Sequence, residues 1–239
     1  MKGRLYFLAL WLAVLNGPAV RAQINWGLLA GGSLATFGPH HGSVSSWEYN
    51  PGAYSLLVTG RGGVTAEAPV NRHWLLDASL SYDGSGSHAV YGSYNFDGGQ
   101  TSTLNIRLSY LQLPMEVIYQ FNPGHAVRFL VGGGVYAAVG VRGKEKGTTI
   151  SLEGPGPLET SPIDNNITFT NKASTENAPF YPSAVKPLDA GYTVMAGIQW
   201  SHFRVSPGFS QGFVNLFPGD MLKGKNKIFS LSLVYWIHA

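Results

Sequence analysis

The sequence contains no cysteine in its 239 residues. Disulfide bridges, thiolate metal sites, iron–sulfur clusters and cysteine nucleophiles are therefore excluded, and so is lipidation at a cysteine. Charged residues are also scarce. They make up 12% of the chain, whereas ordinary soluble domains have about 25%. This amount of charge is too small to cover the surface of an ordinary water-soluble protein.

Long apolar runs are missing after the N-terminus. A transmembrane helix needs at least about 18 consecutive apolar residues, and no such run follows residue 22. Hydrophobic residues nevertheless make up 44% of the chain, with 31 glycines and 13% aromatic residues. This combination favours a membrane β-barrel, in which apolar residues alternate with polar ones instead of forming runs.

The N-terminus has the pattern of a cleaved export signal. Two basic residues precede an apolar run, Leu5–Leu15, that is too short to span a bilayer as a retained anchor. In Val20-Arg21-Ala22, small residues stand at the third and first positions before Gln23, which is the pattern of a signal peptidase cleavage site. We therefore predict a signal peptide over 1–22 and a mature chain over 23–239. Cleavage leaves 13 Lys+Arg against 13 Asp+Glu, and this neutral balance indicates no nucleic-acid partner.

Apolar and polar residues alternate with a period of two along the mature chain, which predicts β-strands. The last segment is the clearest, because its odd-numbered residues are apolar whereas Ser230 and Ser232 occupy the other face. Within another segment the apolar residues change face after Tyr110, which predicts a β-bulge near Tyr110–Leu111. The eight predicted strands are Ile24–Phe37, Tyr54–Ala68, Trp74–Tyr82, Leu104–Phe121, Val127–Val141, Leu188–Trp200, Phe203–Asn215 and Phe229–Ile237.

The links between these segments alternate between long and short. Short links lie at Val70–His73, Asn122–His125 and Ser201–His202, and long ones at Gly38–Ala53, Asp83–Ser102, Gly143–Lys186 and Leu216–Asn226. Outer-membrane barrels have this arrangement, with the short turns in the periplasm. We therefore predict an all-β fold, an eight-stranded antiparallel transmembrane β-barrel with long extracellular loops, in the outer membrane of a Gram-negative bacterium. The alternative is a secreted soluble β-sandwich that binds a ligand.

Charged residues on the face opposite the aliphatic side chains should point into the barrel. These are Arg61, Glu67, Asp77, Arg128 and Arg204, while the side taken by Arg107 and Glu116 depends on the bulge. Eight strands leave only enough room inside for side chains, and an unpaired buried charge is costly. We therefore predict a structural ion-pair network that fills the lumen, with a narrow selective pore as the alternative.

Two motifs resemble a known family. Tyr110-Leu111-Gln112-Leu113-Pro114 is similar to the Tyr-Leu-Glu-Ile-Pro signature of the Bacteroidetes-type outer-membrane β-barrel family, the PorT-like or porin-family proteins. Val131–Tyr136 resembles the glycine-rich strand that follows in that family. The resemblance covers the mature chain and implies the same fold, with no shared catalytic residues. The sequence departs from the family at Gln112, where an acidic residue is frequent, and in lacking a terminal aromatic residue.

No catalytic, cofactor or metal site is predicted. Asp83 and His88 lie near several serines, but a nucleophile elbow leading into a helix is absent. We expect a non-enzymatic protein with a structural or interaction role, and keep a lipid-modifying outer-membrane enzyme as the alternative. Outer-membrane lipids are the expected partners. Lys223, Lys225 and Lys227 are candidate contacts for lipopolysaccharide phosphates.

Overall fold

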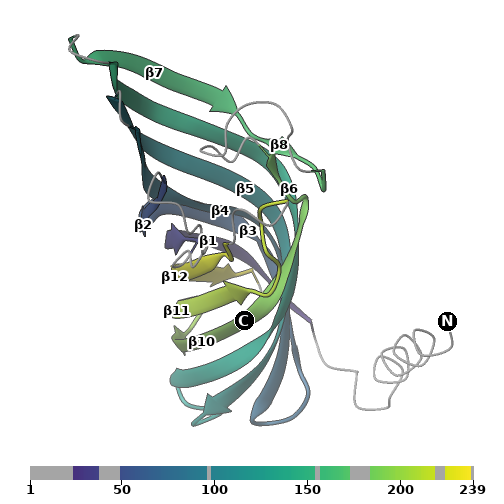
Figure 1. Ribbon diagram of the computed structural model, residues 1–239. Coiled ribbons are helices and arrows are strands. Elements are labelled where there is room, and N and C mark those ends of the chain that lie inside the picture. Colours follow the sequence, from purple (N-terminus) through teal and green to yellow (C-terminus); the bar gives the residue numbers. More distant parts are fainter. Residues whose placement is uncertain are drawn as a thin grey trace, which may run out of the picture.

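The computed structural model describes residues 24–37, 49–95, 98–153, 157–172, 184–218 and 224–237. Eight strands form a closed antiparallel ring, because β10 pairs with both β6 and β11 (Figure 1). The prediction of an all-β, eight-stranded barrel is confirmed. The ring consists of β1 (Asn25–Thr36), β3 (Leu57–Pro69), β4 (Trp74–Asn95), β5 (Gly98–Phe121), β6 (Val127–Glu153), β10 (Leu188–Trp200), β11 (Phe203–Gly212) and β12 (Lys227–Trp236).

Four shorter strands lie outside the ring. β2 (Tyr49–Ser55) pairs with β4, and β7 (Glu159–Asn166) pairs with β6. β8 (Thr168–Phe169) and β9 (Ala184–Val185) form a separate parallel pair. Figure 1 shows that β4, β5 and β6 rise beyond the rest of the ring as a curved wall, with β7 at its edge. None of the described segments is a helix that could cross a membrane.

Short turns join the strands at one end of the barrel, as predicted. They span 70–73, 122–126 and 201–202. Asn122 and Ser201 have positive φ angles of 52° and 46°, and Gly124 has a φ of 88°, which glycine adopts without strain. The predicted signal peptide, residues 38–48 and Lys223 lie outside the described residues.

The prediction that Asp83–Ser102 is a loop is wrong, and so is the prediction for the first part of Gly143–Lys186. β4 and β5 pair continuously from Ser81–Gln112 to Asn95–Gly98, and β6 continues to Glu153. Glycine and serine in these segments resemble loop composition. The backbone hydrogen bonds of a ladder do not depend on side chains, however, so polar strands persist where neighbouring strands are in register.

The predicted bulge near Tyr110–Leu111 lies at the predicted height but in the neighbouring strand β6. Even-numbered residues of β5 from Ser102 to Gln120 face inward without interruption, while Leu111 and Leu113 are exposed on the outside. The pairing of β5 with β6 does shift between Ser109 and Tyr110, but the additional residue is Val141 in β6. The apolar residues of β5 change face because the strand leaves the membrane at this height. Beyond it, the outside of the wall faces water and its inner side becomes the apolar core.

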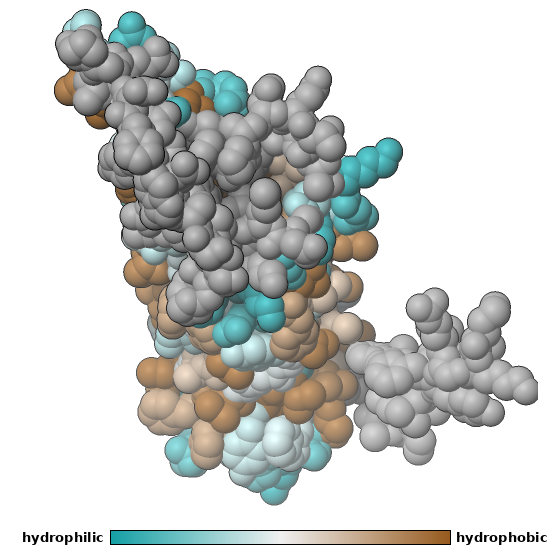
Figure 2. All heavy atoms as spheres, viewed as in Figure 1, coloured by the Kyte–Doolittle hydropathy of each residue, from teal (hydrophilic) through white to brown (hydrophobic). Residues whose placement is uncertain are grey.

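Exposed apolar side chains surround the lower part of the barrel, which Figure 2 shows as a brown band between more polar ends. At the end with the short turns, aromatic residues contact one another on the outer surface. Trp74 packs edge-on against Tyr119 with ring centroids 5.0 Å apart, and Phe203 lies 5.3 Å from Tyr235. Amphipathic rings favour the membrane–water interface, so this end marks one boundary of the bilayer.

Candidate functional site

The centre of the barrel near the short turns contains one buried arginine between two carboxylates. Arg204 of β11 forms ion pairs with Glu67 of β3 and with Asp77 of β4, the latter at 2.8 Å. Glu67 and Asp77 are directly opposite each other in the β3–β4 hairpin, where like charges repel. The Arg204 guanidinium also lies 4.7 Å from the centroid of the Trp236 ring. Arg204 therefore neutralises a pair of acids that the hairpin register forces together.

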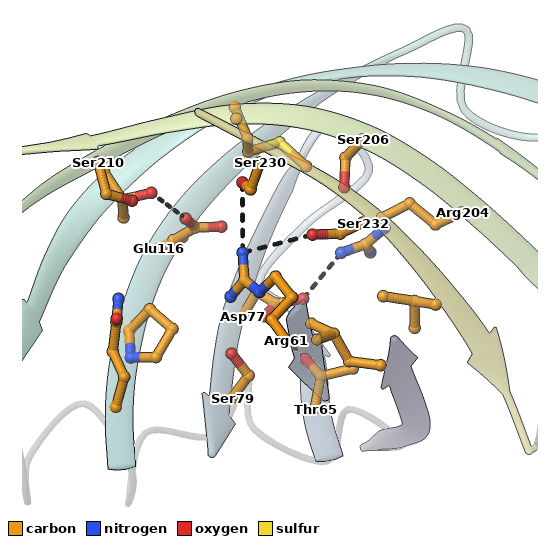
Figure 3. Close-up of a pocket in the computed structure, with 17 residues that line it drawn as sticks. Arg61, Thr65, Asp77, Ser79, Glu116, Arg204, Ser206, Ser210, Ser230 and Ser232 are labelled. Atoms are coloured by element: carbon orange, nitrogen blue, oxygen red, sulfur yellow. Dashed lines mark hydrogen bonds and ion pairs between the residues drawn. The ribbon is translucent and has the colours of Figure 1, made fainter. Parts of the chain in front are cut away.

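A second buried ion pair lies further from the turns. Arg61 Nε is 3.1 Å from Asp83 Oδ1, and Arg61 Nη1 donates to the hydroxyl oxygens of Ser232 and Ser230 at 3.3 and 3.4 Å (Figure 3). Ser81 donates to Asp83 at 2.9 Å. Asp83 is absent from the predicted set because the sequence analysis predicts a loop over Asp83–Ser102. The polar odd-numbered residues continue along β4 from Asp77 through Asp83, and this alternation indicates that Asp83 also faces the lumen.

Glu116 faces the lumen directly opposite Asp77 in the β4–β5 ladder. Thr193 Oγ1 donates to Glu116 Oε1 at 3.0 Å, and Figure 3 shows the carboxylate pointing toward the Arg61 side of the lumen. Side chains fill most of this space and leave a cavity of about 50 Å³. Such a volume holds a few water molecules at most.

The structure separates the other two arginines from this arrangement. Arg128 faces inward near the short turns, where it is half-buried and donates to Gln120 at 3.3 Å. It has no ion pair with any described residue. Arg107 is exposed on the outer face of β5. The predicted network therefore needs correction: Arg204 joins Glu67 and Asp77, Arg61 pairs with Asp83, and Arg128 belongs to neither group. The alternation of apolar and polar residues predicts whether a side chain faces the lumen or the outside. It does not predict the position of the side chain along the barrel axis, which decides its ion-pair partner.

A third polar group, which sequence reasoning missed, lies above the ion pairs. The Asp189 carboxylate accepts hydrogen bonds from the Tyr136 hydroxyl at 3.0 Å and from Asn226 Nδ2 at 2.7 Å. Ser85 in turn donates to Asn226 Oδ1 at 2.6 Å. Asp189 lies on the polar face of its predicted strand, so the sequence predicts that its side chain faces the lumen. Its side-chain partners come from β6 and from the segment before β12, and Ser85 of β4 joins the group through Asn226.

Apolar side chains pack together at both ends of this polar interior. Near the short turns, Leu75, Ile118 and Leu130 pack together with Met195. At the opposite end a larger cluster covers the lumen, with contributions from the rising wall and from the segments that fold over it. Its buried members are Phe37, Ala89, Leu104, Ile106, Leu108, Tyr110, Tyr136, Ala138, Ile167, Val185, Leu216 and Phe217.

The family-like motif lies at the height where the interior changes from the apolar cluster to the polar cavity. Tyr110 belongs to the apolar cluster, whereas Gln112 and Pro114 line the polar cavity below it. Leu111 and Leu113 are exposed on the outer, apolar face. The motif thus lies where β5 enters the membrane.

The candidate hydrolase pair is not assembled. Asp83 faces the lumen and pairs with Arg61, whereas His88 lies on the other face of β4 with Nδ1 3.1 Å from Asn105 Oδ1. Across the described residues, no group of three histidine, aspartate or glutamate side chains could hold a metal ion. Of the predicted lipopolysaccharide contacts, Lys225 is exposed and Lys227 is half-buried, both at the outer end of β12.

A closed ring of strands with an apolar outer band and a polar, filled interior defines a transmembrane β-barrel. The sequence model of the family described as "Outer membrane protein beta-barrel domain" matches residues 19–218, and the chain belongs to this family. The protein is accordingly located in the cell outer membrane. No curated protein sequence matches the chain.

Several solved outer-membrane proteins are similar to this chain. Neisserial surface protein A has 11% sequence identity and a TM-score of 0.40, over 88% of this chain and 96% of that one. The attachment invasion locus protein of Yersinia pestis has 11% identity and a TM-score of 0.37, over 89% and 98%. OprG of Pseudomonas aeruginosa has 12% identity and a TM-score of 0.41, over 90% and 97%.

Proposed function

We propose that this protein is a closed, non-enzymatic barrel of the outer membrane that presents the rising wall β4–β7 as an interaction surface. Within its family, we place it with the PorT-like porin-family proteins that the Tyr110–Pro114 motif resembles. The observation that carries the proposal is the filled interior, in which three polar groups occupy the lumen between two apolar layers.

An ion that entered this lumen would meet two different obstacles. The cluster at the extracellular end is largely apolar, with the Tyr110 and Tyr136 hydroxyls among its few polar atoms, and apolar constrictions exclude ions by dewetting. Below it, the Arg204 group spans the lumen between β11 and the β3–β4 hairpin. These obstacles favour a plugged barrel over the narrow-pore alternative.

The positions of the candidate catalytic residues support a non-enzymatic role. Asp83 and His88 are on opposite faces of β4, so they cannot act as the acid and base of one hydrolytic group. Ser87 faces inward and donates to the carbonyl oxygens of Ser55 and His88. Neither arrangement gives a nucleophile next to a base, which a lipid hydrolase or acyltransferase requires.

The prediction that tests the plugged lumen is electrical. Purified protein that has been reconstituted into planar bilayers should give no resolved unitary conductance steps, because the described side chains around the ion pairs leave a cavity of about 50 Å³ between them. Incorporation is checked in parallel liposomes by flotation and by the heat-modifiable gel band of a folded barrel. A known porin in the same lipid serves as the positive control. Reproducible unitary steps from the folded protein would establish the pore instead.

A further inference from the structure

Charge on this barrel is sorted by face. The carboxylates on described residues of the ring point inward, whereas most basic residues near the extracellular end point outward. The outward acids, Glu159 and Asp164, are both on β7. Among the described residues, the outer surface near the extracellular end therefore carries more basic than acidic side chains. The inward acids are Glu67, Asp77, Asp83, Glu116, Glu145 and Asp189, and the outward bases include Arg107, Arg142, Lys144, Lys146, Lys225 and Lys227.

Basic residues are densest where β5 and β6 leave the membrane. Arg107 is directly opposite Lys144 in the ladder, and Ser109 is opposite Arg142, so the two arginines are diagonal neighbours. Leu111 and Val141, which end the apolar band on these strands, are exposed immediately below them. Like charges that face each other across two strands repel, and a bound anion would remove this repulsion.

The two lysines already share a carboxylate, but the arginines do not. Asp164 of β7 accepts hydrogen bonds from Lys144 at 2.8 Å and Lys146 at 3.2 Å, and these bonds lower the pKa of the Asp164 carboxyl. Neither Arg107 nor Arg142 forms an ion pair with a described residue. The guanidinium groups are therefore available, and their planar fork matches the oxygens of a phosphate.

A groove on the outer surface adjoins Arg107. It has a volume of about 400 Å³ and runs between β3, β4 and β5, with Gly60, Gly62, Gly84 and Tyr82 in its walls. The groove exists because the β3–β4 ladder ends at Arg61–Asp83 and the outward positions on either side are glycines. Its glycine-lined floor lies next to the apolar band, and its upper rim carries a cation.

We propose that Arg107 and Arg142 bind a phosphate of lipid A, the phosphorylated glycolipid anchor of lipopolysaccharide, while one acyl chain of that lipid lies in the groove beside Arg107. The two arginines are at the height where the headgroups of the outer leaflet begin, because the apolar band ends directly below them. This site is separate from Lys225 and Lys227, which lie just before β12 and at its first residue. The proposal does not depend on whether the lumen conducts.

Native mass spectrometry of the folded protein in detergent tests the headgroup contact. Wild-type protein should bind bisphosphorylated lipid A more tightly than the same lipid A without phosphates. The double variant Arg107→Gln/Arg142→Gln should bind the phosphorylated form roughly 30-fold more weakly, since each of the two basic residues contributes about 1 kcal/mol near an anionic surface. Lys225→Gln/Lys227→Gln, which removes the same charge at the start of β12, should bind like wild type.

The groove has its own test. Gly62→Leu leaves every charge in place and fills the groove, and there is room for its Cβ because the nearest heavy atom is Leu29 O at 3.7 Å. This variant should also lose affinity for lipid A. Excess inorganic phosphate should not displace lipid A from the wild-type protein.

Three outcomes would overturn the proposal. Equal affinity for the two forms of lipid A would remove the phosphate contact. An equal or larger loss in the Lys225/Lys227 variant would move the site to β12 or reduce it to general surface charge. Displacement by inorganic phosphate alone would indicate a site for free anions. All variants are compared only after each shows the heat-modifiable band of the folded barrel.

Discussion

Replacing Arg204 with methionine is expected to lower the free energy of unfolding by about 3–5 kcal/mol, the usual cost of removing one partner from a buried ion pair. Arg204 is 2% exposed and is the cation between Glu67 and Asp77. Its loss leaves two directly opposed carboxylates buried with no positive charge between them. A domain with a total stability of roughly 5–15 kcal/mol would lose a large share of it.

Urea titration in detergent micelles, followed by tryptophan fluorescence and by the heat-modifiable band, measures this effect. The matched control is Arg128→Met, because Arg128 is half-buried and has a single hydrogen bond to Gln120. It should cost less than about 1.5 kcal/mol. The triple variant Arg204→Met/Glu67→Gln/Asp77→Asn removes the whole charged group and should regain most of the loss. Equal midpoints for the Arg204 and Arg128 variants would contradict the central role of Arg204.

The ring of strands was predictable because lipid imposes a strict rule on the sequence. Each strand in the membrane must alternate between an apolar face and a lumen face, and β10 shows this over its full predicted range, Leu188–Trp200. The short turns could also be predicted, since Asn122-Pro123-Gly124 is a strong turn sequence. These features depend on local sequence alone.

The rising wall was not predictable by the same rule. Beyond the membrane, the outer face of β5 carries Asn105 and Arg107 while Ile106 and Leu108 face the core, which inverts the pattern. Alternation continues across the boundary, but the meaning of each face reverses. A single strand does not reveal this reversal. The neighbouring strands do, because β6 changes from Val139 to Lys144 at the same height.

The ion-pair partners were beyond sequence reasoning for a geometric reason. Period-two alternation placed Arg61, Glu67 and Asp77 inside, but their partners depend on register and on how far strands are staggered around the ring. Arg61 meets Asp83 through the β3–β4 register, whereas Arg204 reaches Asp77 from a strand 127 residues away in the chain. Neither relation is contained in the pattern of one segment.

The second large effect is expected at the glycine-rich strand of the family-like motif. Gly134 faces the lumen side of β6, and a Cβ there would collide with the carbonyl oxygen of Met115 and lie 2.7 Å from Glu116 Cα. Both atoms are backbone of the adjacent strand β5, so no side chain can move away. Gly134→Ala should therefore cost about 3 kcal/mol, at the upper end of what overpacking usually costs, because relief requires β5 and β6 to separate.

A graded series distinguishes this close approach from a general intolerance of alanine. At Gly133 the added Cβ would lie 3.2 Å from Thr193 O, and at Gly62 it would lie 3.7 Å from Leu29 O, which is ordinary contact. The unfolding midpoint should therefore fall in the order Gly62→Ala, Gly133→Ala, Gly134→Ala, and the folded yield of the last should fall with it. The order follows from backbone distance alone, since all three changes add the same methyl group to a strand. If Gly134→Ala unfolded at the same urea concentration as Gly62→Ala, β5 and β6 would have to lie further apart than the ring geometry places them, and the glycine triplet would need a different explanation.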